Sequence, residues 1–228
     1  MALSFAGSIF KLKTSAFVRG EEISDLNAVM ALCKLNGMDI IPISRSDYKL
    51  EINELAKKFN IDSSFLRVPE GGMGHASIHG FEDLNEIVLK DYSDIIISIG
   101  TGTTFNNFVK ILKNRKINFH GIPAFKGFKK ENHIEENNES CYFHTEYSGA
   151  GFGKFDENLI QYIQHFNQDY GVLLDPIYTA KSMGALEDLI KKQAIKKASK
   201  ILFVHSGGLT GLLSEKSLEL INKKTRNS

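Results

Sequence analysis

The sequence of 228 residues has no tryptophan, only four prolines and only two cysteines, Cys33 and Cys141. These cysteines form neither a disulfide framework nor a zinc-ligand pattern, and they fit the reducing cytoplasm. No apolar run approaches the roughly 20 residues that cross a bilayer, and the first residues lack the leading positive charge of a secretion signal. A net charge of +1 gives no basic surplus, so we expect neither nucleic acid nor a membrane as partner.

The sequence does contain alternating strand-like and helix-like segments. With 42% hydrophobic and 24% charged residues, it has the composition of a soluble globular protein. Strands are predicted at residues 14–18, 38–43, 94–99 and 201–205, and helices at residues 25–36, 50–59, 81–89 and 105–112. Two more helices are predicted after the capping residues Asp156 and Thr179, the first ending at Gly171. This alternation predicts an α/β fold with a layered, mostly parallel sheet flanked by helices.

One loop has the composition of an anion site. Gly100, Thr101, Gly102, Thr103 and Thr104 stand between the apolar strand and the next helix. Backbone amides at a helix N-terminus and the threonine hydroxyls predict a phosphate site there. A plain strand-to-helix turn explains the same residues, so both interpretations stay open. The loop has neither the Gly-Lys-Ser/Thr of a nucleoside-triphosphate loop nor the third glycine of a dinucleotide fingerprint.

The candidate metal ligands are weaker. His75 and His79 are four residues apart and could share a helix face, but neither a third ligand nor an HExxH pattern accompanies them. A packed or surface histidine pair explains them, and no metal site is predicted.

Five segments, in this order, resemble the 1-aminocyclopropane-1-carboxylate deaminase and D-cysteine desulfhydrase family: residues 17–22 (FVRGEE), 69–72 (PEGG), 100–104 (GTGTT), 175–183 (DPIYTAKSM) and 204–209 (VHSGGL). The resemblance runs through nearly the whole chain. It implies a tryptophan-synthase-β-like fold, which is fold type II of the pyridoxal-phosphate enzymes. Residues 1–60 would then be the remnant of the small domain, and residues 61–228 the large domain with its phosphate-binding loop.

The resemblance also implies the cofactor and its surroundings. Pyridoxal 5'-phosphate is expected, with its phosphate at the Gly100–Thr104 loop. Tyr178 matches an active-site tyrosine near the substrate and the cofactor's reactive carbon, and Thr179, Ser206 and Gly207 are expected near the pyridine ring. The substrates implied are small amino acids, 1-aminocyclopropane-1-carboxylate or D-cysteine, and the reaction is that of a lyase or hydrolase. For the assembly, a homodimer is one option.

The chain departs from the family pattern at residues that carry chemistry. The family's Schiff-base lysine precedes a Gly-Gly-x-x-Ser-Asn-His/Gln segment, whose remains we place at residues 5–10. Neither the lysine nor the helix expected after this segment is found, so we predict an N-terminal truncation and an internal deletion after Gly7. The second active-site tyrosine of the family falls on Phe152, which keeps the ring and loses the hydroxyl. Lys181 matches a second family lysine, for which we predict a structural or solvent-facing role rather than that of the missing Schiff-base lysine.

These departures predict that the chain is catalytically inactive. In pyridoxal-phosphate enzymes a lysine anchors the cofactor and moves the proton, so its loss removes both functions and covalent attachment is not expected. Three hypotheses stay open. The chain is a working deaminase or desulfhydrase, or a silent relative with a residual cofactor or phosphate site, or an unrelated nucleotide-binding α/β module.

Overall fold

The computed structural model describes residues 1–20, 26–84, 92–135 and 139–225. The chain forms two compact units, Met1–Val68 and Pro69–Ser228. The boundary predicted after residue 60 lies a short way before the observed break. The assignment of these units as small and large domains stays a prediction.

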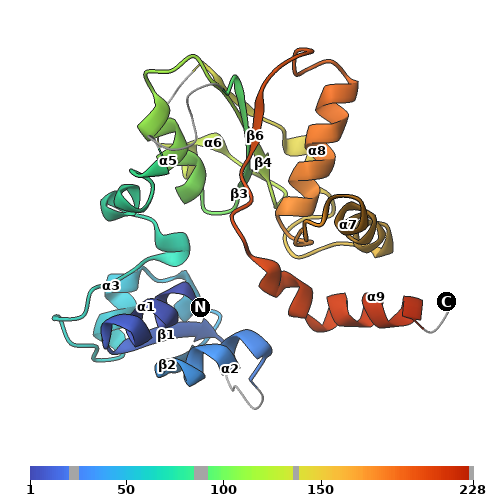
Figure 1. The fold of residues 1–228 in the computed structure, drawn as a ribbon. Coiled ribbons are helices and arrows are strands. Elements are labelled where there is room, and N and C mark those ends of the chain that lie inside the picture. Colours follow the sequence, from blue (N-terminus) through green and yellow to red (C-terminus); the bar gives the residue numbers. More distant parts are fainter. Residues whose placement is uncertain (21–25, 85–91, 136–138, 226–228) are drawn as a thin grey trace. The chain divides into compact units, whose positions relative to one another are not determined.

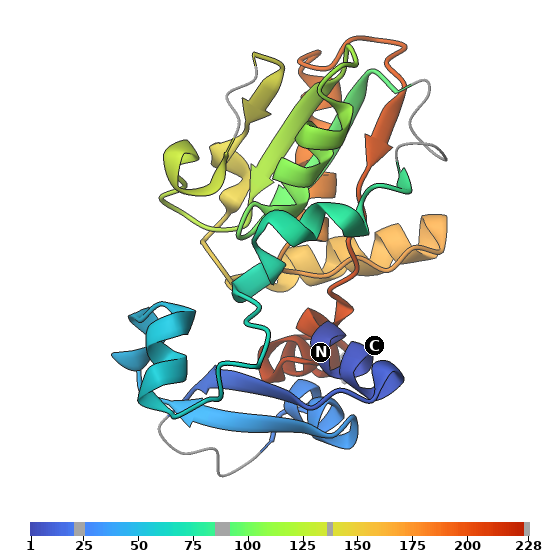
Figure 2. The ribbon, with the colours of Figure 1, turned by 90° about the vertical axis from the view of Figure 1, so that its left-hand side faces the viewer.

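In its described residues, the first unit contains a two-stranded parallel sheet and three α-helices. Strands β1 (Thr14–Arg19) and β2 (Met38–Ile43) pair along their whole length, from Thr14 opposite Met38 to Arg19 opposite Ile43, and lie side by side in Figure 2. The helices are α1 (Ala2–Phe10), α2 (Ala28–Leu35) and α3 (Ile52–Lys58). Pro42 lies within β2 and is tolerated because both strands of a two-stranded sheet are edge strands.

Helix α1 covers residues 5–10, where we placed the remains of the family's Gly-Gly-x-x-Ser-Asn-His/Gln segment, and no further helix separates it from β1. The helix ends at Phe10, and the next residue, Lys11, has a left-handed φ of 54°. Glycine is the residue usually found in this conformation after a helix. This missing stop signal concealed the helix in the sequence. The Asn36 side chain donates a hydrogen bond of 3.2 Å to the buried Ser4 hydroxyl, which ties α1 to the end of α2. The deletion after Gly7 stays a prediction.

The second unit is built on a four-stranded parallel sheet in the order β5-β4-β3-β6. Its strands are β3 (Asp94–Ile99), β4 (Asn118–Pro123), β5 (Cys141–Phe143) and β6 (Ile201–Phe203). Figure 1 shows α5 (Thr103–Leu112) on one face of this sheet and α8 (Thr179–Lys191) on the other. Ile95, Ile97 and Ile99 pack with α5, whereas Ile96 packs with α8. The central strand is thus covered on both faces, as its unbroken apolar run predicts.

The remaining helices are α6 (Lys130–His133), α7 (Glu157–Tyr170) and α9 (Glu215–Thr225). The α7 prediction is confirmed, since Asp156 accepts a hydrogen bond of 3.0 Å from the Leu159 amide and Gly171 ends the helix with φ 67°. The helix predicted at residues 81–89 falls largely outside the described residues. Within the described ranges, no helix combines the length and apolarity needed to cross a membrane.

Candidate functional site

The Gly100–Thr104 loop runs from the carboxyl end of β3 into the first turn of α5, which begins at Thr103. Gly102 precedes the helix with a φ of 94°, and the helix has no acidic side chain in its first turn. The first amides of a helix have no acceptor within the helix, so they present partial positive charge at this point. The hydroxyls of Thr101 and Thr103 lie 3.0 Å apart and add two polar groups to the same edge.

Glycines allow three other segments to approach this loop closely. A Cβ built on Gly71 would lie 2.3 Å from the Thr101 hydroxyl oxygen, so the Pro-Glu-Gly-Gly turn rests directly on the loop. A Cβ built on Gly100 would lie 3.2 Å from the ring of Tyr178, and one on Gly102 would lie 2.3 Å from the carbonyl oxygen of His133. The Gly100–Thr104 loop and Tyr178, both expected at the cofactor, therefore meet, and residues 69–72, another segment of the resemblance, lie against the same loop.

Helix α8 begins at Thr179 with Tyr178 in the N-cap position, which corrects the prediction that Thr179 is the cap, and Asp175 holds the turn that leads into the helix. Its buried carboxylate accepts hydrogen bonds from the amides of Ile177, Tyr178 and Thr179, at 2.8, 2.8 and 2.9 Å. The Thr179 hydroxyl donates to the same carboxylate at 2.7 Å, and it accepts from the Asp175 amide at 2.7 Å. Thr179 is wholly buried in this exchange, so its hydroxyl holds the turn together. The Asp175 carboxylate accepts from the first amide of α8, that of Thr179, and its backbone carbonyl accepts from the next, that of Ala180.

Tyr178 lies at the start of α8 with its ring against Gly100. Burial raises the pKa of its phenol, and the charges of Asp175 and Glu70 raise it further, so the hydroxyl stays protonated at neutral pH. Its ring centroid is 6.0 Å from that of Phe152, in an edge-to-face arrangement of 71°. Phe152, the residue matched to the family's second tyrosine, thus lies beside Tyr178 and is 57% exposed.

The turn at Ser206 and Gly207 follows β6 on the same edge of the sheet. The Gly207 amide donates a hydrogen bond of 3.2 Å to Nδ1 of His205, whose Nε2 donates to the carbonyl oxygen of Leu173 at 2.9 Å. A Cβ built on Gly208 would lie 4.0 Å from the Asp175 carboxylate. The turn is therefore next to the start of α8. Carboxyl ends of neighbouring parallel strands form the usual ligand crevice of α/β sheets, and β3 and β6 are such neighbours.

Lys181 is buried, with 8% of its surface exposed. Its ammonium donates hydrogen bonds to the backbone carbonyl oxygens of Ala124, Ser148 and Gly151, at 3.2, 3.1 and 2.8 Å. Burial lowers the pKa of this amine, and the charge of Asp175 opposes the shift. The predicted structural role fits these contacts.

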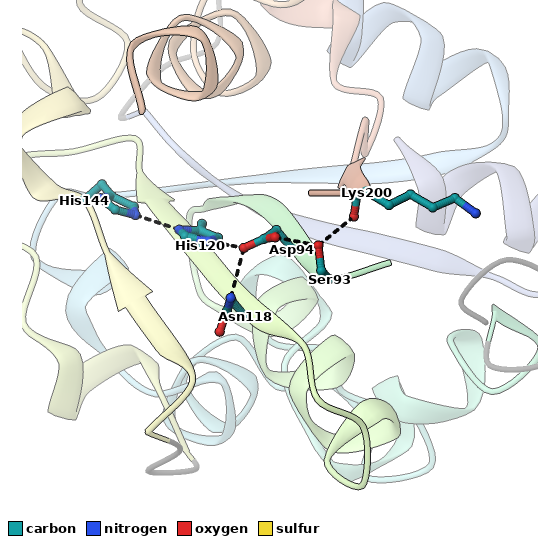
Figure 3. Close-up of polar contacts among 6 residues, drawn as sticks. All are labelled: Ser93, Asp94, Asn118, His120, His144 and Lys200. Atoms are coloured by element: carbon teal, nitrogen blue, oxygen red, sulfur yellow. Dashed lines mark hydrogen bonds and ion pairs between the residues drawn. The ribbon is translucent and has the colours of Figure 1, made fainter. Parts of the chain in front are cut away.

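A second polar group, which the sequence did not predict, lies at the opposite edge of the sheet (Figure 3). His120 bridges His144 and Asp94, with ring nitrogens 3.0 Å from His144 Nε2 and 3.1 Å from the Asp94 carboxylate. Asn118 and Ser93 donate to the same carboxylate at 3.0 and 2.7 Å. Burial raises the pKa of Asp94, but these hydrogen bonds outweigh it and the net shift is downward. These residues come from β3, from β4 and from the segment after β5, which are far apart in sequence, so the pairing of the strands brings them together.

No metal cluster accompanies either group: the part of the chain that the structure describes contains no set of three histidine, cysteine or acidic residues placed to hold a metal ion. Of the site residues predicted from sequence, Gly100–Thr104, Tyr178 and Thr179 lie together. Ser206 and Gly207 lie in the turn beside Asp175. The signal that sequence reasoning missed at this edge is Asp175, which holds the backbone that carries Tyr178.

Comparison with known proteins defines the class of this fold. A solved structure described as an ACC deaminase homologue superposes with a TM-score of 0.70 at 23% identity, covering 95% of this chain and 73% of that one. An O-acetylserine-dependent cystathionine β-synthase from Helicobacter pylori superposes with a TM-score of 0.64 at 17% identity. The chain has the tryptophan-synthase-β-like fold, type II of the pyridoxal-phosphate enzymes, as predicted.

Sequence comparison confirms the predicted resemblance. A Thermotoga maritima protein provisionally named 1-aminocyclopropane-1-carboxylate deaminase is 22% identical over 94% of this chain and 75% of its own length. The D-cysteine desulfhydrase of Klebsiella pneumoniae is 38% identical, over only 30% of this chain and 21% of its own length. Matches to relatives from Schizosaccharomyces pombe and Pyrococcus furiosus span 56% and 48% of those proteins, about half of their length. No family model matches the chain.

Proposed function

We propose that this chain binds pyridoxal 5'-phosphate reversibly, without a covalent bond to lysine, and does not turn over amino acids by itself. The coarser part of this proposal, a pyridoxal-phosphate-dependent function of the deaminase and desulfhydrase type, is supported by the homologues. The proposal that this chain itself binds the cofactor depends on one observation. The Gly100–Thr104 loop and Tyr178 are in contact at the carboxyl end of the sheet.

The residues present at this edge fit the phosphate group of the cofactor. The start of α5 offers amides without an acidic neighbour in its first turn, and Thr101 and Thr103 add hydroxyls. Glycine at 100 and 102 keeps the backbone free of side chains where Tyr178 and the His133 carbonyl approach. A phosphate that binds at a helix N-terminus needs these features.

The neighbouring aromatic side chains of Tyr178 and Phe152 offer a surface for the ring of the cofactor. Tyr178 and Phe152 meet edge to face, and Tyr178 keeps its proton because its pKa is raised. Its hydroxyl can therefore donate a hydrogen bond to a ligand, while Phe152 offers only an apolar edge. When bound, the cofactor supplies an electron sink for a carbanion at the α-carbon of an amino acid.

The described residues of this site include no free amine that could transfer a proton in the reaction. Among the described residues, Lys181 is the buried lysine, and its ammonium donates to three backbone carbonyl oxygens. General acid-base catalysis by a positioned group contributes about 10²–10⁴-fold, so its loss reduces turnover toward background. We therefore propose that this chain binds the cofactor, with a small amino acid as its expected ligand. Its described residues offer no free amine at this site to move the proton of the reaction.

The test is equilibrium dialysis of the purified chain against pyridoxal phosphate. We expect saturable binding that inorganic phosphate displaces and that is lost on dialysis against cofactor-free buffer. Pyridoxal without phosphate should bind at least tenfold more weakly, because the helix N-terminus recognises the anion. Adenine nucleotides that bind more tightly than pyridoxal phosphate would contradict the proposal and favour a nucleotide-binding module.

A second candidate is an active deaminase or desulfhydrase, which the names of the relatives favour. It predicts release of ketobutyrate from 1-aminocyclopropane-1-carboxylate, or of pyruvate from D-cysteine, by the cofactor-loaded chain. Steady release in proportion to enzyme concentration would establish this candidate and refute the proposal of an inactive chain. The proposal predicts no release above that of the free cofactor.

A further inference from the structure

The ammonium of Lys181 is enclosed by backbone carbonyl oxygens from three separate segments. Ala124 follows β4, Ser148 ends the turn Thr145–Ser148, and Gly151 lies in the loop that carries Phe152. We call the oxygens of Ala124, Ser148 and Gly151 the carbonyl cage. A protonated lysine has three N–H groups and no acceptor, so the cage satisfies each donor once.

The cage differs from an ordinary ion pair because it contains no carboxylate. Within the described ranges, the salt bridges of this chain join other residues, and Asp175 acts on Lys181 only through its longer-range field. A buried charge is costly unless fixed dipoles or charges surround it. Rings of backbone carbonyl oxygens that replace a hydration shell are the environment that proteins build for potassium and similar monovalent cations.

We propose that Lys181 is a tethered monovalent cation, and that the carbonyl cage is a cation site which binds free ammonium or potassium when the lysine amine is removed. The role of the bound charge is to join the segments after β4 and around residues 148–151 to α8. Lys181 is thereby a positioning residue, since it fixes the loop that places Phe152 beside Tyr178. This inference concerns a cation site, and it stands whether or not the chain binds pyridoxal phosphate.

The test compares thermal unfolding of Lys181→Met in different chloride salts of equal ionic strength. Methionine keeps most of the apolar stem and leaves the cage without its cation. We expect the variant to lose about 5–10 °C of Tm in tetramethylammonium chloride, because three buried carbonyls lose their partner. Ammonium or potassium chloride should restore at least half of that loss, since these ions fit a carbonyl cage and tetramethylammonium does not.

The matched control is Lys191→Met, which removes one positive charge from an exposed position on the same helix. Its Tm should change little and should not distinguish ammonium from tetramethylammonium. A Lys181→Met variant whose Tm is unchanged, or is equally low in all three salts, would overturn the proposal.

If Lys181→Met does not accumulate as folded protein, it can be refolded from urea in the same salts. The proposal then predicts recovery of folded protein in ammonium chloride and much less in tetramethylammonium chloride. Equal recovery in the two salts, or none in either, would overturn it. Ion selectivity is the decisive readout, because a lysine that serves only as packing gives no preference among cations.

Discussion

The turn that leads into α8 allows the sharpest test of how this edge of the sheet is built. Replacing Asp175 with alanine removes the acceptor of three backbone amides and of the Thr179 hydroxyl, all at 2.7–2.9 Å. Since Asp175 is completely buried, water cannot take over these bonds. We therefore expect the variant to be far less stable than the loss of an ordinary helix cap would make it.

The magnitude follows from the number of donors. Loss of an exposed N-cap costs typically about 1 kcal/mol. A buried donor without an acceptor costs about 1–3 kcal/mol, and the values do not add because all four donors share one carboxylate. We expect Asp175→Ala to lower the free energy of unfolding by about 3–5 kcal/mol, and Asp175→Asn, which keeps one oxygen, by less.

The assay is urea unfolding followed by circular dichroism, with Asp156→Ala as the matched control. Asp156 caps α7 from an exposed position through one hydrogen bond, to the amide of Leu159. Its removal should cost about 1 kcal/mol. Equal losses in the two variants would refute the reasoning, because the burial and the three further donors of Asp175 would then contribute nothing.

Two more predictions concern the loop and the histidine pair. Gly100→Ala places a Cβ 3.2 Å from the Tyr178 ring and should weaken pyridoxal-phosphate binding at least tenfold. The control Gly184→Ala, whose Cβ would have open space around it, should not change binding. Equal affinities of the two variants would contradict the placement of the site. Burial and the neighbouring His120 lower the pKa of His144 below 6.5, so the unfolded chain binds more protons and stability falls as pH drops through 6.5. His144→Gln should flatten that fall in a pH series of Tm values, and an unchanged slope would contradict it.

Patterns of residues within a single segment predicted secondary structure correctly. The apolar run of β3, the stripe of α5 and the Asp156 and Gly171 signals of α7 each depend on neighbours a few residues away, and the structure confirms all three. By contrast β4 was missed. His120 and Gly121 interrupt its apolar run, and it is a strand because it pairs with β3 and β5 on its two sides.

Contacts between distant segments were the unpredictable part. The resemblance implied that the Gly100–Thr104 loop and Tyr178 lie at one site, and in the structure they are in contact. Neither resemblance nor local pattern indicated that Asp175 holds the turn that leads into α8, or that Lys181 is enclosed by carbonyl groups. Both follow from side chains that reach across the fold, and so does the chain from Asp94 to His144.

The central claim, a cofactor held without a lysine bond, is tested most directly by borohydride reduction of the cofactor-saturated chain followed by mass spectrometry. We expect the protein to keep its unmodified mass after reduction and dialysis, although the same sample shows saturable binding beforehand. A stoichiometric reduced adduct on one lysine, at Lys181 or elsewhere, would contradict it.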